Sequence, residues 1–347
     1  MKLSSYPLLP FSFLYAGITN TRNWLFDHNL LQTVNFPVPI INVGNLTVGG
    51  TGKTPHVEYL VRFLQNKKLA ILSRGYKRET KGFVLAGPDA TPASLGDEPY
   101  QYFQAFPMVT VAVCEDRVLG INNILARQPT TEIILLDDAY QHRWVKTHLN
   151  ILITDYHRPF YQDFVLPAGR LRERRKGAAR ADIILVSKSP LPTPAAKQAE
   201  ICRHIQKYAK PGVPIFFTTY AYQPPVSFGL PDPIKQNIVL VTGIAQPKLL
   251  MDNLIQKGYQ LIKHFDFPDH HAYNQDNIKQ IYNFVQANNT APVSVLTTQK
   301  DWTKLNVPAF SQLMQQLSIF YIPITVSFLG NEARFKQLIF ESAVIAT

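Results

Sequence analysis

A glycine-rich segment between an apolar strand and a helix constrains the fold of this chain most. The run Gly49-Gly50-Thr51-Gly52-Lys53-Thr54 follows the apolar stretch 38–43 and precedes a helical stretch at 55–65. Glycines let successive backbone N–H groups turn toward phosphate oxygens, and the N-terminus of the next helix adds partial positive charge. The segment therefore predicts a phosphate-binding loop; the alternative is a glycine-rich turn without a ligand.

This loop departs from the strict pattern GxxxxGK[ST], because Thr47 stands where the first glycine would be. We expect Lys53 to reach the β- and γ-phosphates of a nucleoside triphosphate, and the Thr54 hydroxyl to ligate Mg²⁺. The expected nucleotide-binding residues are Thr47, Val48, Gly49, Gly50, Thr51, Gly52, Lys53 and Thr54.

An acidic pair follows another apolar strand, as such loops usually require. Residues 133–136 are Ile-Ile-Leu-Leu and run into Asp137 and Asp138. One of these carboxylates is expected to hold Mg²⁺ directly or through water. Taken alone, two aspartates after a strand are also ordinary turn residues.

Apolar strand-like runs alternate with helical stretches along most of the chain, which predicts α/β subdomains with mostly parallel sheets. A Pro-rich passage near 211–233 interrupts this alternation, and a second, shorter α/β pattern follows it. We expect an N-terminal helix at 1–25 and a P-loop NTPase-like domain at 26–220. A linker at 221–236 and a smaller C-terminal α/β domain at 237–347 would complete the chain. In the smaller domain, 319–328 is expected to be one strand.

Composition narrows the class of protein and of partner. The chain has 347 residues, is 46% hydrophobic, and carries a net charge of +11. It can therefore bury a core, and its charge favours an anionic membrane surface, nucleic acid or phosphorylated substrate. Two cysteines exclude a disulfide framework, and no cysteine spacing indicates zinc.

The N-terminus is unusually apolar for a charged protein. Residues 7–18 are almost entirely apolar, and Phe11, Leu14 and Ile18 recur at helical spacing. The run falls short of the ~20 apolar residues that a spanning helix needs. It predicts a helix lying in the membrane interface, with a buried amphipathic helix as the alternative.

Two polar clusters are candidates for a general base. Asp97 and Glu98 lie in a turn, and Asp269, His270 and His271 lie far along the chain. A carboxylate beside an imidazole can accept the proton of an attacking hydroxyl. Taken alone, each cluster is more often a polar turn or a surface histidine.

Taken in order, these motifs resemble the tetraacyldisaccharide 4′-kinase family over nearly the whole chain. Three positions depart from the family pattern: Ala139 replaces a glycine, Arg174 a proline and Gln299 a glutamate. The resemblance rests on 43–47 before GGTGKTP, on 72–76, on Gly96-Asp97-Glu98-Pro99, on Asp137-Asp138 with Gln141-His142, on 166–173, on 243–247, on Phe267 with Asp269-His270, and on Lys300-Asp301.

The resemblance implies transfer of the γ-phosphate of ATP to the 4′-hydroxyl of a tetraacylated glucosamine disaccharide 1-phosphate, giving lipid IVA. It implies Mg²⁺, two α/β subdomains joined by a hinge, and action at the cytoplasmic face of the Gram-negative inner membrane. It also implies that Asp97 is the base with support from His270, and that Asp138 and Glu173 are acidic site residues with metal-related roles.

Arginines in two loops are expected near the strand ends, where open α/β sheets bind ligands. Arg74, Arg170 and Arg172 are expected to hold the substrate phosphate or developing charge, with a solvated basic face as the alternative. Two other functions remain open: an ATPase or GTPase acting on a macromolecule such as nucleic acid, and a non-catalytic nucleotide-binding scaffold. The first leaves the apolar N-terminus, Asp97 and His270 without a role, so no nucleic acid is expected as a partner. The presence of Lys53, Thr54 and Asp138 speaks against the second.

Overall fold

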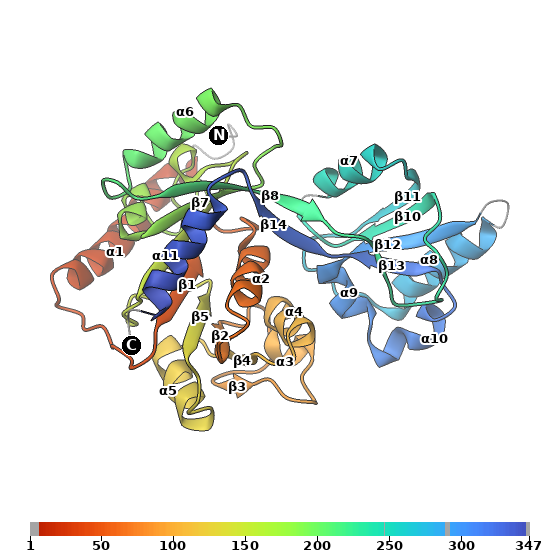
Figure 1. Ribbon diagram of the computed structural model, residues 1–347, viewed down its shortest axis with the longest axis horizontal. Coiled ribbons are helices and arrows are strands. Elements are labelled where there is room, and N and C mark those ends of the chain that lie inside the picture. Colours follow the sequence, from red (N-terminus) through yellow and green to blue (C-terminus); the bar gives the residue numbers. More distant parts are fainter. Residues whose placement is uncertain (1–6, 246, 289–291, 345–347) are drawn as a thin grey trace.

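The structure, a computed structural model, has two sheets of unequal size, each covered by helices (Figure 1). It describes residues 7–245, 247–288 and 292–344. The start of the expected N-terminal helix at residues 1–6 lies outside the described residues, as does the end of the chain at 345–347. We call the part built on the nine-stranded sheet the large subdomain, and the part built on the five-stranded sheet the small subdomain.

The nine-stranded sheet has the order β14-β8-β7-β6-β1-β5-β2-β4-β3. Its pairs are parallel from β8 to β4, and β14 and β3 are antiparallel edge strands. The strands are β1 (Ile40–Gly44), β2 (Leu69–Ser73), β3 (Val84–Leu85), β4 (Thr110–Val113), β5 (Ile133–Asp137), β6 (Leu149–Asp155), β7 (Ile183–Ser187), β8 (Ile215–Tyr222) and β14 (Ile324–Phe328).

Helices bury both faces of this sheet, which explains why its central strands are apolar at successive positions. Ile41 and Val43 of β1 pack with α2 and α11 on one face, and Ile40 packs with α5 on the other. The helices of the large subdomain are α1 (Leu9–Asp27), α2 (Lys53–Phe63), α3 (Pro92–Leu95), α4 (Asp97–Ala105), α5 (Arg117–Arg127), α6 (Ala195–Gln206) and α11 (Glu332–Val344).

The small subdomain has the strand order β11-β10-β12-β13-β9, parallel except for β9. Its strands are β9 (Val226–Ser227), β10 (Asn237–Thr242), β11 (Gln260–Asp266), β12 (Val293–Thr298) and β13 (Ile319–Ile322), and its helices are α7 (Lys248–Gln256), α8 (Gln275–Ala287), α9 (Gln299–Leu305) and α10 (Ser311–Met314).

The end of the chain differs from the sequence-based expectation. The stretch 319–328, expected to be one strand of the small sheet, is divided at Pro323 into β13 in the small sheet and β14 in the large sheet. Proline has no backbone N–H to continue a ladder, which favours a break there. The last strand and α11 therefore return to the large subdomain, so the C-terminal unit does not extend over 237–347 as expected.

The two subdomains are joined by two chain segments, which follow β8 and precede β14. These strands pair antiparallel from Tyr222–Ile324 to Thr218–Phe328 and form a ribbon that runs toward the small subdomain (Figure 1). The expected linker at 221–236 contains the end of β8 and all of β9. A paired ribbon is stiffer than a single linker and limits how the subdomains move.

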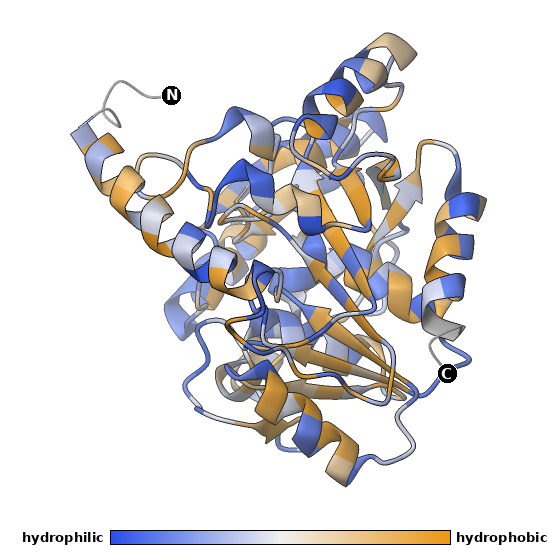
Figure 2. Ribbon diagram, turned by 90° about the vertical axis from the view of Figure 1, so that its left-hand side faces the viewer, coloured by the Kyte–Doolittle hydropathy of each residue, from blue (hydrophilic) through white to orange (hydrophobic). Residues whose placement is uncertain are grey.

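Helix α1 lies on the outside of the large subdomain, with hydrophobic residues along its length (Figure 2). As far as Thr19 its inward side is small or polar, with Ser12, Ala16 and Thr19 buried, and the aromatic Phe26 is buried in the last turn. Its outward side is apolar: Phe13 is 71% exposed and Leu14 67%. This polarity is the reverse of an ordinary surface helix, so a buried amphipathic helix does not describe α1.

Within the described ranges, no helix is both long enough and apolar enough to cross a membrane.

Candidate active site

The glycine-rich loop lies between β1 and α2, at the carboxyl end of the large sheet. Gly49 and Gly52 have φ values of +106° and +86°, which side chains other than glycine rarely adopt. At Gly52 an added Cβ would also lie 2.5 Å from the Tyr220 hydroxyl of β8. The loop therefore needs glycine for its backbone at both positions, and for space at Gly52.

Side chains from outside the loop hold it in place. Asn45 Nδ2 donates to Thr51 Oγ1 at 2.8 Å, and Ser187 Oγ donates to the Thr51 carbonyl at 2.7 Å. The buried imidazole of His56 donates from Nδ1 to the Gly52 carbonyl at 2.7 Å, and its Nε2 accepts from Thr218 Oγ1 at 2.9 Å. Burial lowers the pKa of His56 to about 4, so it is neutral at physiological pH.

The arginine-bearing loop 170–172 runs beside the start of the phosphate loop. Val48 N donates to the Arg170 carbonyl at 2.8 Å, and Arg172 N donates to the Leu46 carbonyl at 2.7 Å. Arg170 is exposed next to Gly49, and Arg74 is exposed after β2. The structure thus places Arg170 beside the phosphate loop.

The acidic pair meets the loop because β5 is the parallel neighbour of β1. Lys53 Nζ lies 3.5 Å from Asp138 Oδ1. The Arg172 guanidinium donates hydrogen bonds to both oxygens of Asp138, at 2.8 and 3.0 Å. Burial acts to raise the pKa of Asp138, but Lys53 and Arg172 outweigh it and lower the pKa to about 2. Arg172 was expected to bind substrate, and here its guanidinium is paired with this carboxylate.

Asp137 differs from its neighbour. It is 4% exposed, Ser73 donates to its Oδ2 at 3.2 Å, and its buried Oδ1 has no partner among the described residues. Burial and the adjacent charge of Asp138 raise the pKa of Asp137 to about 7, against the effect of Lys53. An unpartnered buried oxygen at this edge of the sheet suits a cation.

Glu173 is fully buried, and the structure occupies both of its oxygens. Asn23 of α1 donates to Oε2 at 2.7 Å, while Gln141 and Arg180 donate to Oε1 at 3.0 and 2.7 Å. Among described residues, no group of three or more acidic, histidine or cysteine side chains is arranged to hold a metal ion. Glu173 therefore ties α1 to the site loops.

The two residues expected to act as the general base and its support, Asp97 and His270, lie in contact although they belong to different subdomains. Asp97 starts α4 of the large subdomain, and His270 lies after β11 of the small one. His270 Nδ1 is 3.0 Å from Asp97 Oδ2, and the Tyr76 ring packs edge-on against the imidazole at 5.7 Å. Residues 173 positions apart thus meet at one carboxylate–imidazole contact.

Residues that the sequence did not single out also contact the site. Lys304 Nζ lies 2.7 Å from Asp97 Oδ2. Arg117 is 3% exposed and donates to the Cys114 and Glu115 carbonyls at 3.0 Å each. Burial lowers the pKa of Arg117 to about 10, although Asp138 and Asp137 favour its charged form. No sequence pattern marks either residue, because both act through contacts made in the folded chain.

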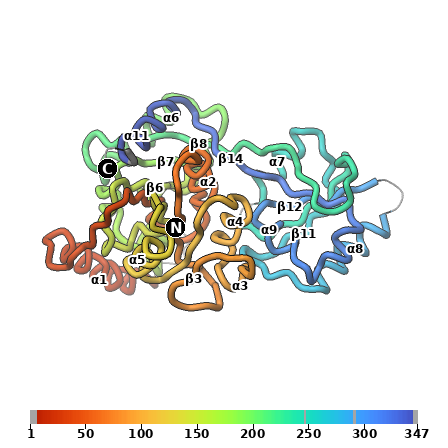
Figure 3. Tube along the Cα trace, turned by 60° about the horizontal axis from the view of Figure 1, so that its bottom comes forward, coloured from red at the N-terminus to blue at the C-terminus, as the bar shows by residue number. Residues whose placement is uncertain are grey.

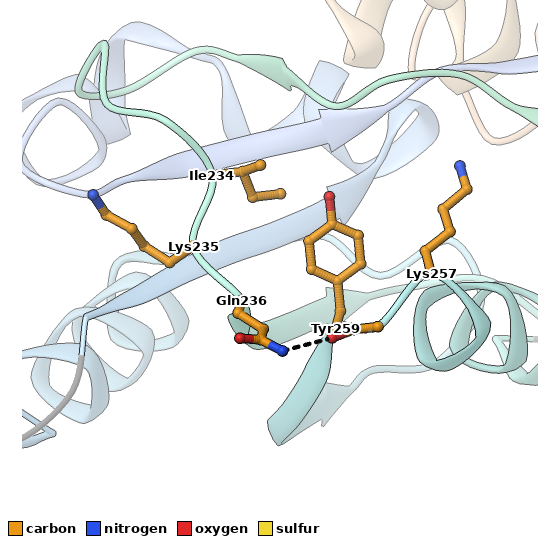
Figure 4. A pocket seen from close by; sticks show the side chains of 6 residues that line it. Ile234, Lys235, Gln236, Lys257 and Tyr259 are labelled. Atoms are coloured by element: carbon orange, nitrogen blue, oxygen red, sulfur yellow. Dashed lines mark hydrogen bonds between the residues drawn. The ribbon is translucent and has the colours of Figure 1, made fainter.

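A pocket in the small subdomain lies at the amino-terminal ends of β10 and β11 (Figure 4). Its lining, 234–236 and 257–259, precedes β10 and β11, whereas His270 lies beyond their carboxyl ends. It is therefore not part of the candidate active site.

Comparison with known proteins matches the chain to one family over nearly its full length. The family profile described as tetraacyldisaccharide-1-P 4′-kinase matches residues 4–343. A tetraacyldisaccharide 4′-kinase of Cytophaga hutchinsonii is 41% identical over 339 residues, covering 94% of this chain and 92% of the relative. One from Flavobacterium johnsoniae is 41% identical and covers 98% of each.

A solved structure agrees with this match. The crystal structure of LpxK from Aquifex aeolicus in complex with ATP has a TM-score of 0.78 and 30% identity, covering 98% of this chain and all of that one. It confirms the α/β fold and the kinase class expected from the sequence. The site described above combines the phosphate loop, the acidic pair and the Asp97–His270 contact between the subdomains. The chain that carries it belongs to the tetraacyldisaccharide 4′-kinase family.

Proposed function

We propose that this chain transfers the γ-phosphate of ATP to the 4′-hydroxyl of an acylated glucosamine disaccharide 1-phosphate, forming lipid IVA. The observation that carries the proposal is the Asp97–His270 contact at 3.0 Å, which joins the small subdomain to the subdomain that contains the phosphate loop. A nucleotide hydrolase acting on nucleic acid would leave this pair and the apolar face of α1 without a role.

The nucleotide is bound by loop 47–54. Its backbone N–H groups and the N-terminus of α2 face the phosphates, and Lys53 balances the charge of the transferring group. Asp138 forms an ion pair with Lys53 at 3.5 Å, and Arg172 in turn donates hydrogen bonds to Asp138. Arg74 and Arg170 are exposed and free to contact the substrate 1-phosphate or the γ-phosphoryl group.

Mg²⁺ fits this donor set through the Thr54 hydroxyl and the unpartnered oxygen of Asp137. Asp138 is placed to act through water, because its oxygens are paired with Arg172. The ion would supply charge neutralisation between the β- and γ-phosphates. A direct metal role for Glu173 stays a prediction from the sequence, and its three donors favour a structural role.

Asp97 is the general base. The acceptor 4′-hydroxyl gives its proton to the carboxylate as its oxygen bonds to the γ-phosphorus, and the bond to the β-phosphate oxygen breaks to release ADP. His270 orients Asp97 from the small subdomain. Transfer therefore requires both subdomains to contact each other.

The acceptor is reached at the cytoplasmic face of the Gram-negative inner membrane. The outward face of α1 is apolar, and the net charge of +11 favours an anionic lipid surface. Both features support a peripheral, monotopic association through α1.

The test is phosphate transfer from γ-labelled ATP to the acylated disaccharide 1-phosphate, with the product identified by mass. We expect one added phosphate on the non-reducing sugar and little ATP turnover without acceptor. ATP turnover that ignores this acceptor and increases with nucleic acid would contradict the proposal.

A further inference from the structure

Two lysines on α9 point at the acidic start of α4. Lys300 and Lys304 are four residues apart, so they share one face of their helix. Helix α9 belongs to the small subdomain and packs against α4 of the large one (Figure 3). Helix α4 begins with Asp97 and Glu98. The lysines therefore reach the proposed base from across the subdomain boundary.

Lys304 forms the shorter of these contacts. Its Nζ lies 2.7 Å from Asp97 Oδ2 and donates to the His271 carbonyl at 3.2 Å. Its side chain is only 8% exposed. A pair this shielded from water interacts far more strongly than a surface ion pair, and removing one member strands the other charge.

Lys300 contacts the imidazole instead. Its Nζ lies 3.2 Å from His270 Nε2, 3.2 Å from Asp269 Oδ1 and 3.6 Å from Glu98 Oε1. An ammonium group only donates hydrogen bonds, so Nε2 must accept. The proton of the neutral ring is then on Nδ1, which faces Asp97 Oδ2 at 3.0 Å. Lys300 thus fixes the tautomer that donates to Asp97.

These contacts involve only one of the two oxygens of the Asp97 carboxylate. His270 and Lys304, both from the small subdomain, occupy Oδ2. In the described part of the chain, no hydrogen bond or ion pair is recorded at Oδ1. Oδ1 is therefore the oxygen left to accept a proton.

We propose that Lys304 is a positioning residue that keeps Asp97 ionised and turned toward the acceptor, with Lys300 setting the tautomer of His270. The inference rests on the proposed role of Asp97 as base. Because Lys304 and His270 come from the small subdomain, the base is complete only when that subdomain is seated on α4.

The balance of groups around Asp97 agrees with this arrangement. Burial acts to raise the pKa of Asp97, but hydrogen bonds from His270 and Lys304 and the charges of Lys304 and Lys300 outweigh it, leaving a lowered pKa. Two further acids face this cluster, Glu98 and Asp269, and each lies within 4 Å of Lys300 Nζ. Without Lys304, burial would raise the pKa of Asp97 and protonate it at higher pH.

The experiment compares Lys304→Met, which removes the charge at similar size, with Lys304→Arg, which keeps it. The kcat of phosphate transfer is measured from pH 4.5 to 8.5 in the full-length protein. We expect Lys304→Met to move the acidic limb up by at least one pH unit, so that kcat at acidic pH falls about tenfold more than at pH 8. Lys304→Arg should hold the limb near its wild-type position.

Lys336→Met is the matched control, because Lys336 pairs with Glu332 on the exposed face of α11. It should leave the whole pH profile unchanged. Thermal unfolding of the full-length protein reports whether Lys304→Met still folds. Equal loss of kcat at every pH in Lys304→Met, or a limb that Lys304→Arg does not restore, overturns the inference.

Asp97→Asn separates this inference from the proposed function. If Asp97→Asn retains wild-type transfer, the base assignment itself fails. If Asp97→Asn loses transfer while Lys304→Met keeps the wild-type limb, only the role of Lys304 fails.

Discussion

The phosphate loop and the Asp97–His270 pair are assembled in opposite ways. The loop is one short segment between β1 and α2, and its conformation depends on glycines within that segment. The Asp97–His270 pair joins two subdomains, and its residues are 173 positions apart in the sequence. The comparison teaches that nucleotide binding is built locally, whereas proton transfer depends on how the subdomains meet.

Loss of the loop lysine has the largest expected effect. Lys53→Ala removes the charge facing the transferring phosphate, so transfer should fall below detection even with the base pair intact. Rates are measured with labelled ATP, and thermal unfolding checks the fold. Near-normal transfer in a folded variant would contradict the conclusion that the loop binds the transferring phosphate.

Mutation of the Asp97–His270 pair should slow phosphate transfer without weakening nucleotide binding. Asp97→Ala is expected to reduce kcat by ~10²–10⁴, the usual range for loss of a general base. MgATP affinity should persist, because Asp97 is not among the residues expected to bind the nucleotide or Mg²⁺. An equal loss of MgATP affinity would reassign Asp97 to the metal.

A double mutant sharpens the same point. If Asp97 and His270 act as one unit, Asp97→Ala with His270→Ala should be no slower than Asp97→Ala alone. Multiplied losses in the double mutant would show that the two side chains act separately.

The apolar face of α1 provides a third test, outside both regions. Phe13→Gln with Leu14→Gln should weaken binding to anionic vesicles by at least ~10²-fold, since each buried side chain contributes about 1.5–3 kcal/mol. Vesicle flotation measures this, and transfer to a detergent-dispersed acceptor should change less.

Phe340→Gln is the matched control, because Phe340 is 56% exposed on α11. It should leave flotation unchanged. Full binding by the α1 double variant would place the membrane contact elsewhere.

The smallest expected effect concerns a polar contact at the subdomain boundary. Gln299 Nε2 of α9 lies 3.4 Å from Glu58 Oε1 of α2, which also accepts from Gln101 at 2.7 Å. Burial raises the pKa of Glu58, against the effect of Arg62 and Gln101. Gln299→Glu would add a second buried carboxyl whose proton the folded state holds more tightly than the unfolded state.

The folded variant then binds more protons than the unfolded chain, so its stability should fall relative to wild type as pH rises from 5 to 8, by ~1–2 kcal/mol. Urea unfolding measures this. Glu58→Gln together with Gln299→Glu restores one carboxyl and one amide and should recover most of the loss. A pH-independent difference would show that the contact is not electrostatic.

The same division explains what was predictable. The glycine-rich loop, the strands β1 and β5, and the helix α2 followed from glycine placement and hydrophobic periodicity, which are local signals. The return of β14 to the large sheet did not follow, because nothing local in 319–328 indicates which sheet the residues after Pro323 join.

The sequence by itself determined a nucleotide-binding α/β chain with an apolar N-terminal helix, because glycine conformations and side-chain periodicity act over a few residues. The tertiary structure alone decided which face of α1 is apolar and outward, that Glu173 is held by three donors, and that Lys304 meets Asp97. These features depend on contacts between distant segments, and the packing of the two subdomains sets them.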